Sequence, residues 1–196
     1  MHYKITKMKK ILIINGHPNI ESFNYALSKA YRKGAIGSGA EVRQIDIANL
    51  DFDVFKLKSL DSFKVPRDLE KAQKDIKWSE HIVFVHPIWW GTLPAILKSF
   101  FEQTFLMGFA AQFEPNGKIT KLLTGKSARI ISTLDTPVWI FKFLLKDPSF
   151  KTHKANLNFC GIKPVKGTYY SPIVKSTKEQ REKWLKETEQ LGEQLK

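Results

Sequence analysis

The sequence predicts an open α/β fold, in which five parallel strands form one sheet with helices packed on both faces. Apolar runs alternate with amphipathic stretches along the whole chain. Two of these runs, Ile11–Ile14 and His81–Val85, are apolar enough to be strands buried on both faces, as parallel strands are. The 196 residues contain no repeat, no low-complexity segment and no linker. We therefore expect a single domain over residues 1–196.

The first half of the chain predicts three strands and two helices. After the strand at 11–14, residues 22–33 form a helix, because their apolar positions recur with helical spacing at Phe23, Ala26, Leu27, Ala30 and Tyr31. The alternating stretch 41–47 reads as an edge strand. A second helix begins near Pro66, since proline suits a first turn, and ends at about Trp78. The strand at 81–85 follows.

The second half continues the alternation of helices and strands. Thr92 and Pro94 begin a helix whose apolar stripe is Ile96, Leu97, Phe100, Phe101 and Phe105. Two further strands are expected at 128–133 and 163–170. Between them the segments 137–143 and 151–159 are expected to be helical, with a break near Pro148.

A last helix starts at Thr177, where Ser176 and Glu179 have the spacing of a capping box. The order is thus β-α repeated five times. Five parallel strands with helical crossovers favour the doubly wound order 2-1-3-4-5, which makes a three-layer sandwich. In such a sheet ligands bind beyond the carboxyl ends of strands 1 and 3, where the strand order reverses. The loops after Ile14 and after Val85 are therefore the expected binding loops.

Composition restricts the class of protein and its partners. The formal net charge is +13, which favours anionic partners such as phosphorylated cofactors, anionic lipid or nucleic acid, or simply aids solubility. The basic residues are spread along the chain, so we expect no nucleic acid as the main partner. Cys160 is the single cysteine and cannot form an internal disulfide. Neither a signal peptide nor a membrane span is evident, and the cytoplasm is the expected location. We expect no metal site, because His81 and His86 would not converge from one strand.

The loop after the first strand has the features of an anion cradle. It runs from Asn15 to Asn24 and leads directly into a helix, whose first N–H groups and partial positive charge favour phosphate. Gly16 permits close approach of the backbone, Ser22 is a suitable N-cap, and His17 and Asn24 could add donors. An ordinary capped helix after a turn is the alternative interpretation.

The loop after the third strand has two adjacent tryptophans, Trp89 and Trp90, followed by Gly91. A strand end in this fold faces the binding cleft, so plain core is a poor explanation for both rings. A flat tricyclic ring such as isoalloxazine needs an apolar wall and a few backbone donors, and this segment could supply both. Alternatively, one or both rings brace the loop or a subunit interface.

Two motifs in this order make the chain similar to the flavodoxin-like NAD(P)H dehydrogenase (quinone) family, which includes DT-diaphorase and bacterial quinone reductases. The first is G-H-P-x-x-x-S-F-N over Gly16–Asn24, and the second is P-x-W-W-G-x-x-P-A-I-L-K over Pro87–Lys98. The phenylalanine-rich stretch from Phe100 to Phe113 also resembles the family. The resemblance covers the chain from about Lys10 to the last helix.

The resemblance implies three groups of cofactor-binding residues. The flavin-phosphate loop would comprise His17, Ser22, Phe23 and Asn24. The segment along the isoalloxazine ring would comprise Pro87, Ile88, Trp89, Trp90 and Gly91. The second flavin loop would comprise Ser132, Thr133, Leu134 and Asp135.

This second flavin loop departs from the pattern that it resembles. Many family members carry Thr-Thr-Gly-Gly there, whereas this chain has Ser132-Thr-Leu-Asp-Thr-Pro137. An ionised Asp135 near the pyrimidine end would disfavour an anionic reduced flavin. Alternatively, Asp135 caps the helix expected near Pro137. The Tyr–His pair that assists hydride transfer in DT-diaphorase has no match, since Trp139 and Phe141 stand in that region. The catalytic acid–base residues therefore stay unknown.

The resemblance further implies that Phe105, Phe109 and Phe113 wall the substrate pocket, often from a partner subunit; plain helix core is the alternative. The expected activity is two-electron hydride transfer from NAD(P)H, through flavin N5, to a quinone or similar acceptor with ping-pong kinetics. We expect FMN, with FAD as the alternative, and a homodimer. NADH and NADPH are not distinguished. Two other functions stay open: a regulatory flavoprotein subunit of a membrane transporter, which allows peripheral membrane contact, and a flavodoxin-type electron carrier.

Overall fold

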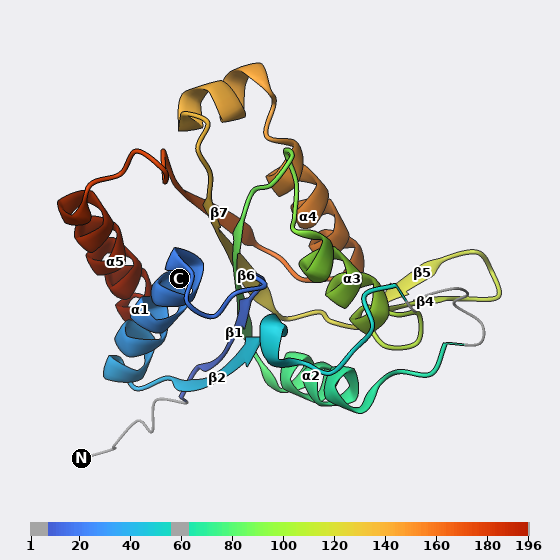
Figure 1. Cartoon of the computed structure of the whole chain (residues 1–196). Coiled ribbons are helices and arrows are strands. Elements are labelled where there is room, and N and C mark those ends of the chain that lie inside the picture. Colours follow the sequence, from blue (N-terminus) through green and yellow to red (C-terminus); the bar gives the residue numbers. More distant parts are fainter. Residues whose placement is uncertain (1–7, 56–62, 196) are drawn as a thin grey trace, which may run out of the picture.

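The computed structural model describes residues 8–55 and 63–195, which form a three-layer α/β sandwich (Figure 1). The central sheet has five parallel strands in the order β2-β1-β3-β6-β7. Numbered by the parallel strands alone, this is the order 2-1-3-4-5, and the predicted fold is confirmed. The strands are β1 (Lys10–Asn15), β2 (Glu41–Asp46), β3 (His81–Pro87), β6 (Ser127–Thr133) and β7 (Val165–Tyr170).

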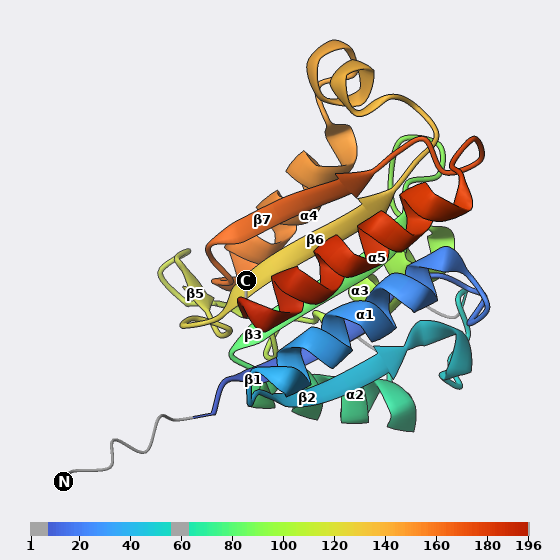
Figure 2. The ribbon, with the colours of Figure 1, turned by 90° about the vertical axis from the view of Figure 1, so that its left-hand side faces the viewer.

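Five α-helices cover the two faces of this sheet. On one face lie α1 (Phe23–Gly37) and α5 (Lys178–Glu193), and on the other lie α2 (Arg67–Trp78), α3 (Ala95–Thr104) and α4 (Pro148–Cys160) (Figure 2). Alternate residues of each strand point to opposite faces, so each buried strand contributes to two cores. Ile11 and Ile13 pack under α1 and α5, whereas Leu12 and Ile14 pack under α2 and α3. This explains why β1 and β3 are continuously apolar.

The predicted helices and strands are present, with a few shifted boundaries. Helix α4 begins at Pro148, because Asp147 caps it and proline occupies its first turn. Pro66 is the N-cap of α2, not a residue of its first turn. The N-cap of α5 is Thr177, whose hydroxyl accepts the N–H of Gln180. The predicted capping box of Ser176 and Glu179 is therefore wrong by one position.

Two elements differ from the expected pattern. A short antiparallel hairpin of β4 (Ala111–Phe113) and β5 (Ile119–Lys121) follows α3, where the sequence analysis expected no strand. Each strand has only three residues, which is too short for alternation to be recognised. The helical segment expected at 137–143 contains a π-helical turn at Ile140–Leu144.

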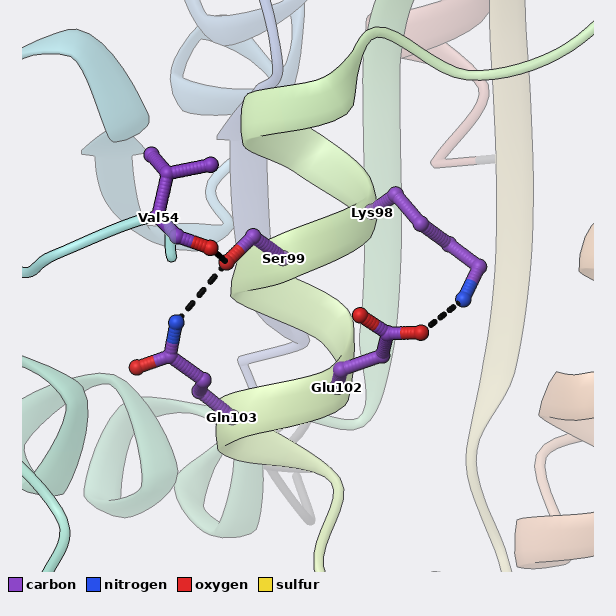
Figure 3. A network of polar contacts seen from close by, with 5 residues as sticks. All are labelled: Val54, Lys98, Ser99, Glu102 and Gln103. Atoms are coloured by element: carbon purple, nitrogen blue, oxygen red, sulfur yellow. Dashed lines mark hydrogen bonds and ion pairs between the residues drawn. The ribbon is translucent and has the colours of Figure 1, made fainter. Parts of the chain in front are cut away.

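Helix α3 also holds the chain that follows β2 (Figure 3). The Ser99 hydroxyl donates to the carbonyl of Val54 at 2.8 Å, and the Gln103 amide donates to the carbonyl of Asp53 at 2.8 Å. Lys98 and Glu102 pair one turn apart on the outer side of the same helix. The 51–55 segment is thus fixed to α3, the helix that follows the loop after β3.

In the stretches 8–55 and 63–195, we find no helix with both the length and the apolar character needed to cross a membrane.

Candidate functional site

A pocket lies beyond the carboxyl ends of β1, β3 and β6, at the point where the strand order reverses. Its volume is about 160 Å³. Its wall is formed by residues from four loops: His17, Ser22, Phe23, Asn24, Pro87, Ile88, Trp89, Thr133, Leu134, Asp135 and Ile173. Ten of the thirteen residues singled out in the sequence for cofactor binding are therefore brought together here. The exceptions are Trp90, Gly91 and Ser132.

The N-terminus of α1 provides the donors at one end of this pocket. Ser22 is the N-cap, with extended backbone and a hydroxyl oxygen that accepts the N–H of Tyr25 at 3.2 Å. The N–H groups of Phe23 and Asn24 lie in the first turn, where a helix offers no acceptor of its own. The hydroxyl proton of Ser22 and these two N–H groups are donors suited to an oxyanion.

His17 adds a further donor beside the helix. Its Nδ1 accepts the N–H of Asn19 at 2.9 Å, so that in the neutral ring Nε2 carries the proton. Partial burial lowers the pKa of His17, which favours the neutral ring near pH 7. The imidazole also stands edge-on to Trp89, with ring centroids 5.3 Å apart. The first and second binding loops are thus in direct contact.

Asn24 braces the site, contrary to its expected role as a free donor. Its amide Nδ2 donates to Thr133 Oγ1 at 2.9 Å, and the Thr133 hydroxyl donates back to Asn24 Oδ1 at 2.7 Å. Both side chains are buried. The pair joins the start of α1 to the end of β6 and fixes the spacing of two binding loops.

The peptide group between Pro87 and Ile88 is held at both its N–H and its carbonyl. The N–H of Ile88 donates to the Thr133 carbonyl at 2.7 Å, and the Pro87 carbonyl accepts Nδ1–H of the fully buried His86 at 2.9 Å. Behind His86 lies His153 of α4, with ring centroids 5.8 Å apart. The apolar wall of the pocket is therefore supported from α4 as well as from β6.

Trp90 and Gly91 form a tight turn at the edge of the pocket. Trp89 and Thr92 exchange two backbone hydrogen bonds at 3.0 Å, and both residues between them have positive φ, 50° at Trp90 and 80° at Gly91. Glycine accepts this backbone readily, whereas tryptophan there is strained. The Trp90 side chain is fully exposed to solvent. Of the two tryptophans, therefore, only Trp89 contributes its ring to the pocket of its own chain.

The loop after β6 is tied to the loop after β7. Asp135 Oδ1 accepts the N–H of Val174 at 2.7 Å, and the N–H of Ile173 donates to the Leu134 carbonyl at 3.1 Å. Asp135 thus fastens two loops, and the structure shows no cap from it on the helical turn after Pro137. Ser132 is buried within β6 and lies outside the pocket wall.

Ile173 lines the pocket but was not singled out in the sequence. Its position depends on the pairing of β6 with β7 and on the bond to Leu134, which join residues distant in the sequence. No motif around Ile173 indicates this contact. The only signal in the sequence is that Ile173 lies in the loop that follows the last strand of the sheet.

Phe105, Phe109 and Phe113 lie away from this pocket within the same chain. Phe105 stacks on Phe101 at 4.1 Å and lines a second, apolar cavity of about 340 Å³ between α3, the hairpin and α4. Phe109 is buried in the core, as its alternative interpretation stated, while Phe113 is 62% exposed on β4. Within one chain these rings do not wall the first pocket.

The residues of the first pocket fit the phosphate and polyol part of a flavin. First-turn N–H groups, a hydroxyl and an imidazole N–H match a phosphate monoester. The pocket also contains the apolar surfaces of Phe23, Ile88 and Trp89 beside these donors. Its volume is small for an entire flavin, so the structure fits a ring that lies at the open mouth.

Comparison with known proteins agrees with this geometry. Residues 9–195 match the family described as flavodoxin-like fold. A protein named as an uncharacterized NAD(P)H oxidoreductase of Haemophilus influenzae is 28% identical over 169 residues, which cover 83% of each chain. NAD(P)H dehydrogenase [quinone] 1 of Cavia porcellus is 30% identical over 124 residues, 53% of this chain and 45% of that protein. The match thus spans about half of this longer relative.

Two solved structures are also similar. A protein from Streptococcus mutans is 31% identical, with a TM-score of 0.82 over 94% of this chain and 98% of that one. An FMN-dependent NADH-azoreductase from Bacillus anthracis, solved in complex with FMN, is 20% identical, with a TM-score of 0.71 over 96% of this chain and 99% of that one. That likeness concerns the fold alone. The chain therefore belongs to the flavodoxin-like fold family, among relatives named as NAD(P)H oxidoreductases and quinone dehydrogenases.

Proposed function

We propose that this protein is a flavin-dependent oxidoreductase that takes two electrons from NAD(P)H and gives them to a quinone or a similar acceptor. The observation that carries the proposal is the pocket at the switch point, where donors for a phosphate and an apolar wall stand side by side. When bound, the flavin supplies the chemistry by accepting a hydride and passing on two electrons. The chain binds, orients and shields it.

Each part of the pocket has a role in this proposal. His17, Ser22 and the first-turn N–H groups of α1 bind the flavin phosphate. Ile88 and Trp89 form the wall beside the ring, and Thr133 and Leu134 form the opposite side. Asn24, Asp135 and His86 hold these loops in place through the hydrogen bonds described above.

FMN suits this chain better than FAD. The pocket has donors for one phosphate at its α1 end. The depression beside the edge strand β2 carries the carboxylates of Asp46, Asp68 and Asp75. Lys71 and Arg43 pair with the latter two, so the negative charge that would disfavour a second phosphate there rests mainly on Asp46. The net charge of +13 favours the approach of NADH and NADPH alike.

A second copy of the chain would complete the substrate side of the site. The pocket is open where the ring and the acceptor would lie, and Phe105, Phe109 and Phe113 are at the other end of the molecule. An exposed Phe113 and an apolar cavity lined by Phe105, Met107 and Phe159 offer the kind of surface that could cover a partner's ring. This supports the homodimer that the resemblance implies.

The direct test is an absorption spectrum of the purified protein before and after anaerobic addition of NADPH. We expect flavin bands that bleach on addition and return when a quinone is added. Because donor and acceptor would share one place, double-reciprocal plots should give parallel lines. A colourless protein that neither FMN nor FAD reconstitutes would refute the proposal.

A pair of variants locates the flavin at the pocket. Ser22→Ala removes the hydroxyl donor and the N-cap, and should weaken FMN binding by about tenfold. Ser38→Ala removes a hydroxyl at the opposite end of the same helix, where it donates to the Glu193 carbonyl, and serves as the matched control. Equal FMN affinity in the two variants would place the flavin elsewhere.

A further inference from the structure

The helical turn that follows the pocket loop after β6 stands out from the body of the molecule. Residues 138–145, which we call the apolar knob, are the orange turn at the top of Figures 1 and 2. Its four large apolar side chains are exposed to solvent: Trp139 by 64%, Phe143 by 80%, Leu144 by 72% and Leu145 by 51%. Four exposed large apolar side chains so close together in the sequence indicate an interaction site.

The knob is firmly attached to the sandwich. Phe141 is buried, and its carbonyl accepts the N–H of Asp147 at 3.0 Å. The carboxylate of Asp147 accepts the Tyr169 hydroxyl of β7 at 2.5 Å and caps α4 through the N–H of Phe150. Burial and this hydrogen bond raise the pKa of Tyr169, so the phenol remains a donor. The exposed side chains are therefore displayed on a fixed base.

The backbone at the end of the knob is strained. Lys146 and Asp147 are consecutive non-glycine residues with positive φ, 59° and 51°. A left-handed pair of this kind persists only where the surroundings determine it, and it commonly marks a functional segment. The π-helical turn at Ile140–Leu144 is a second irregularity of the same kind.

Positive charge surrounds the knob. The carboxylates nearest to it in the sequence, Asp135 and Asp147, both accept hydrogen bonds, from the Val174 N–H and from the Tyr169 hydroxyl. Lys142 and Lys146 lie in or next to the knob, Lys151 lies in the first turn of α4, and Lys175 follows the exposed Val174. The 171–176 loop is fixed beside the knob, because the Ser171 hydroxyl donates to the Thr136 carbonyl at 2.6 Å.

We propose that the apolar knob and its lysines dock on an anionic membrane surface. Exposed Trp, Phe and Leu side chains enter the headgroup region, and lysines at their edge contact anionic lipid. An isologous contact between two copies through the knob would instead place Lys142 and Lys146 near their own equivalents, in molecules of net charge +13. The lipid surface is the occupant whose charge is complementary.

Docking in this way would bring the proposed site close to the bilayer. Leu134 and Asp135 lead from the pocket directly into the knob, and Ile173 joins the pocket to the neighbouring loop. A membrane-dissolved quinone could then reach the pocket mouth without crossing bulk water. Only this last step rests on the proposed function, since lipid binding itself requires neither flavin nor acceptor.

Sedimentation with vesicles tests the proposal on the whole 196-residue chain as purified. We expect binding to vesicles of phosphatidylcholine and phosphatidylglycerol, weak binding to pure phosphatidylcholine, and loss of binding at high salt. Phe143→Glu together with Leu144→Glu should reduce partitioning by more than about tenfold. Lys146→Gln together with Lys175→Gln should reduce it by roughly fivefold for each charge removed.

Phe55→Glu is the matched control, because it introduces the same charge at another exposed phenylalanine, 88% exposed in the segment after β2, to which neither proposal gives a role. It should leave vesicle binding unchanged. The flavin spectrum and its bleaching by NADPH should persist in the knob variants, which separates this proposal from the proposed function. Equal binding by the Phe143/Leu144 variant and wild type would overturn the proposal. So would a lipid-free dimer that the same variant converts to a monomer, since the knob would then be an interface between copies.

Discussion

The Asn24–Thr133 pair joins two pocket loops across 109 positions of sequence, and it does so with buried groups. Removing one partner leaves the other buried without its hydrogen bond, which costs about 1–3 kcal/mol. We expect Asn24→Ala to lower the free energy of unfolding by this amount and to weaken FMN binding, as measured by urea denaturation and flavin titration. The double variant with Thr133→Val should be less destabilised than the sum of the single changes. Additive losses would show that the pair does not act as a unit.

Three buried histidines make the stability sensitive to acid. Burial lowers the pKa of His86 to about 4 and that of His81 to about 3, and it holds the pKa of His153 well below its usual 6.5. All three are neutral when folded but become protonated near pH 6.5 when unfolded. The unfolded chain thus binds more protons, and stability falls as the pH drops below about 6.5.

The size of this effect follows from the number of protons. With three histidines the slope near pH 5 approaches about 4 kcal/mol per pH unit. We expect His153→Leu to reduce the slope by roughly a third, as measured by urea denaturation at pH 7 and pH 5. A slope unchanged in this variant would mean that His153 is protonated in the folded protein.

Helices α1 and α5 approach each other more closely than side chains normally allow. A Cβ atom at Gly34 would lie 2.0 Å from the Glu189 carbonyl oxygen, and one at Gly192 would lie 2.2 Å from that of Tyr31. Only backbone of the opposite helix meets these positions, so nothing flexible can move aside. The two glycines therefore set the spacing of this layer.

Two glycine-to-alanine substitutions in α1 should therefore change the stability of the protein in opposite directions. Gly34→Ala forces α1 and α5 apart, and we expect it to destabilise the protein by at least about 1–3 kcal/mol. Gly37→Ala meets no atom within 4 Å and should stabilise the helix by roughly 0.5–1 kcal/mol. Thermal unfolding of both variants measures the difference. Similar melting temperatures would contradict the close approach.

The elements that the sequence predicted well are those with long, regular patterns. The apolar runs of β1 and β3 and the spaced apolar residues of α1 were sufficient to identify buried strands and a covering helix. The three-residue strands β4 and β5 are mostly exposed and show no such pattern. The N-cap of α5 differs by one residue because Ser176 instead bonds the Ile173 carbonyl and accepts Nε–H of Arg181.

The same distinction applies to the site. The phosphate loop and the Pro87–Trp89 wall follow directly from their order after two strands. The use of Asn24 and Asp135 as braces does not, since their partners Thr133 and Val174 are supplied by the folded sheet. Ile173 was missed for the same reason.

At the scale of the whole molecule, the separation of Phe113 from the pocket makes a dimeric site testable by complementation. One variant, Ser22→Ala with His17→Ala, should lose the flavin, and another, Phe113→Ala with Met107→Ala, should lose the covering surface. The two variants are unfolded, combined in equal amounts and refolded together. Half of the dimers should then contain one copy of each variant, and each of these has one complete site, so up to about a quarter of wild-type turnover should return.

The complementation assay has a clear negative outcome. If each copy covered its own pocket, no combination of the two variants would contain a complete site, and the mixture would stay inactive. Each variant, unfolded and refolded alone, provides the baseline turnover.

The strand order has a consequence for how the chain reaches this structure. Lys10 of β1 pairs with Glu41, 31 positions away, while Ile11 pairs with His81, 70 positions away. Every ladder of the main sheet joins distant residues, so the entropy of closing long loops precedes the gain from pairing. Refolding should therefore be slow for a protein of this size. Until the ladders close, Ile11–Ile14 and Ile82–Val85 stay open to solvent as apolar strand segments, and aggregation competes with folding at high concentration.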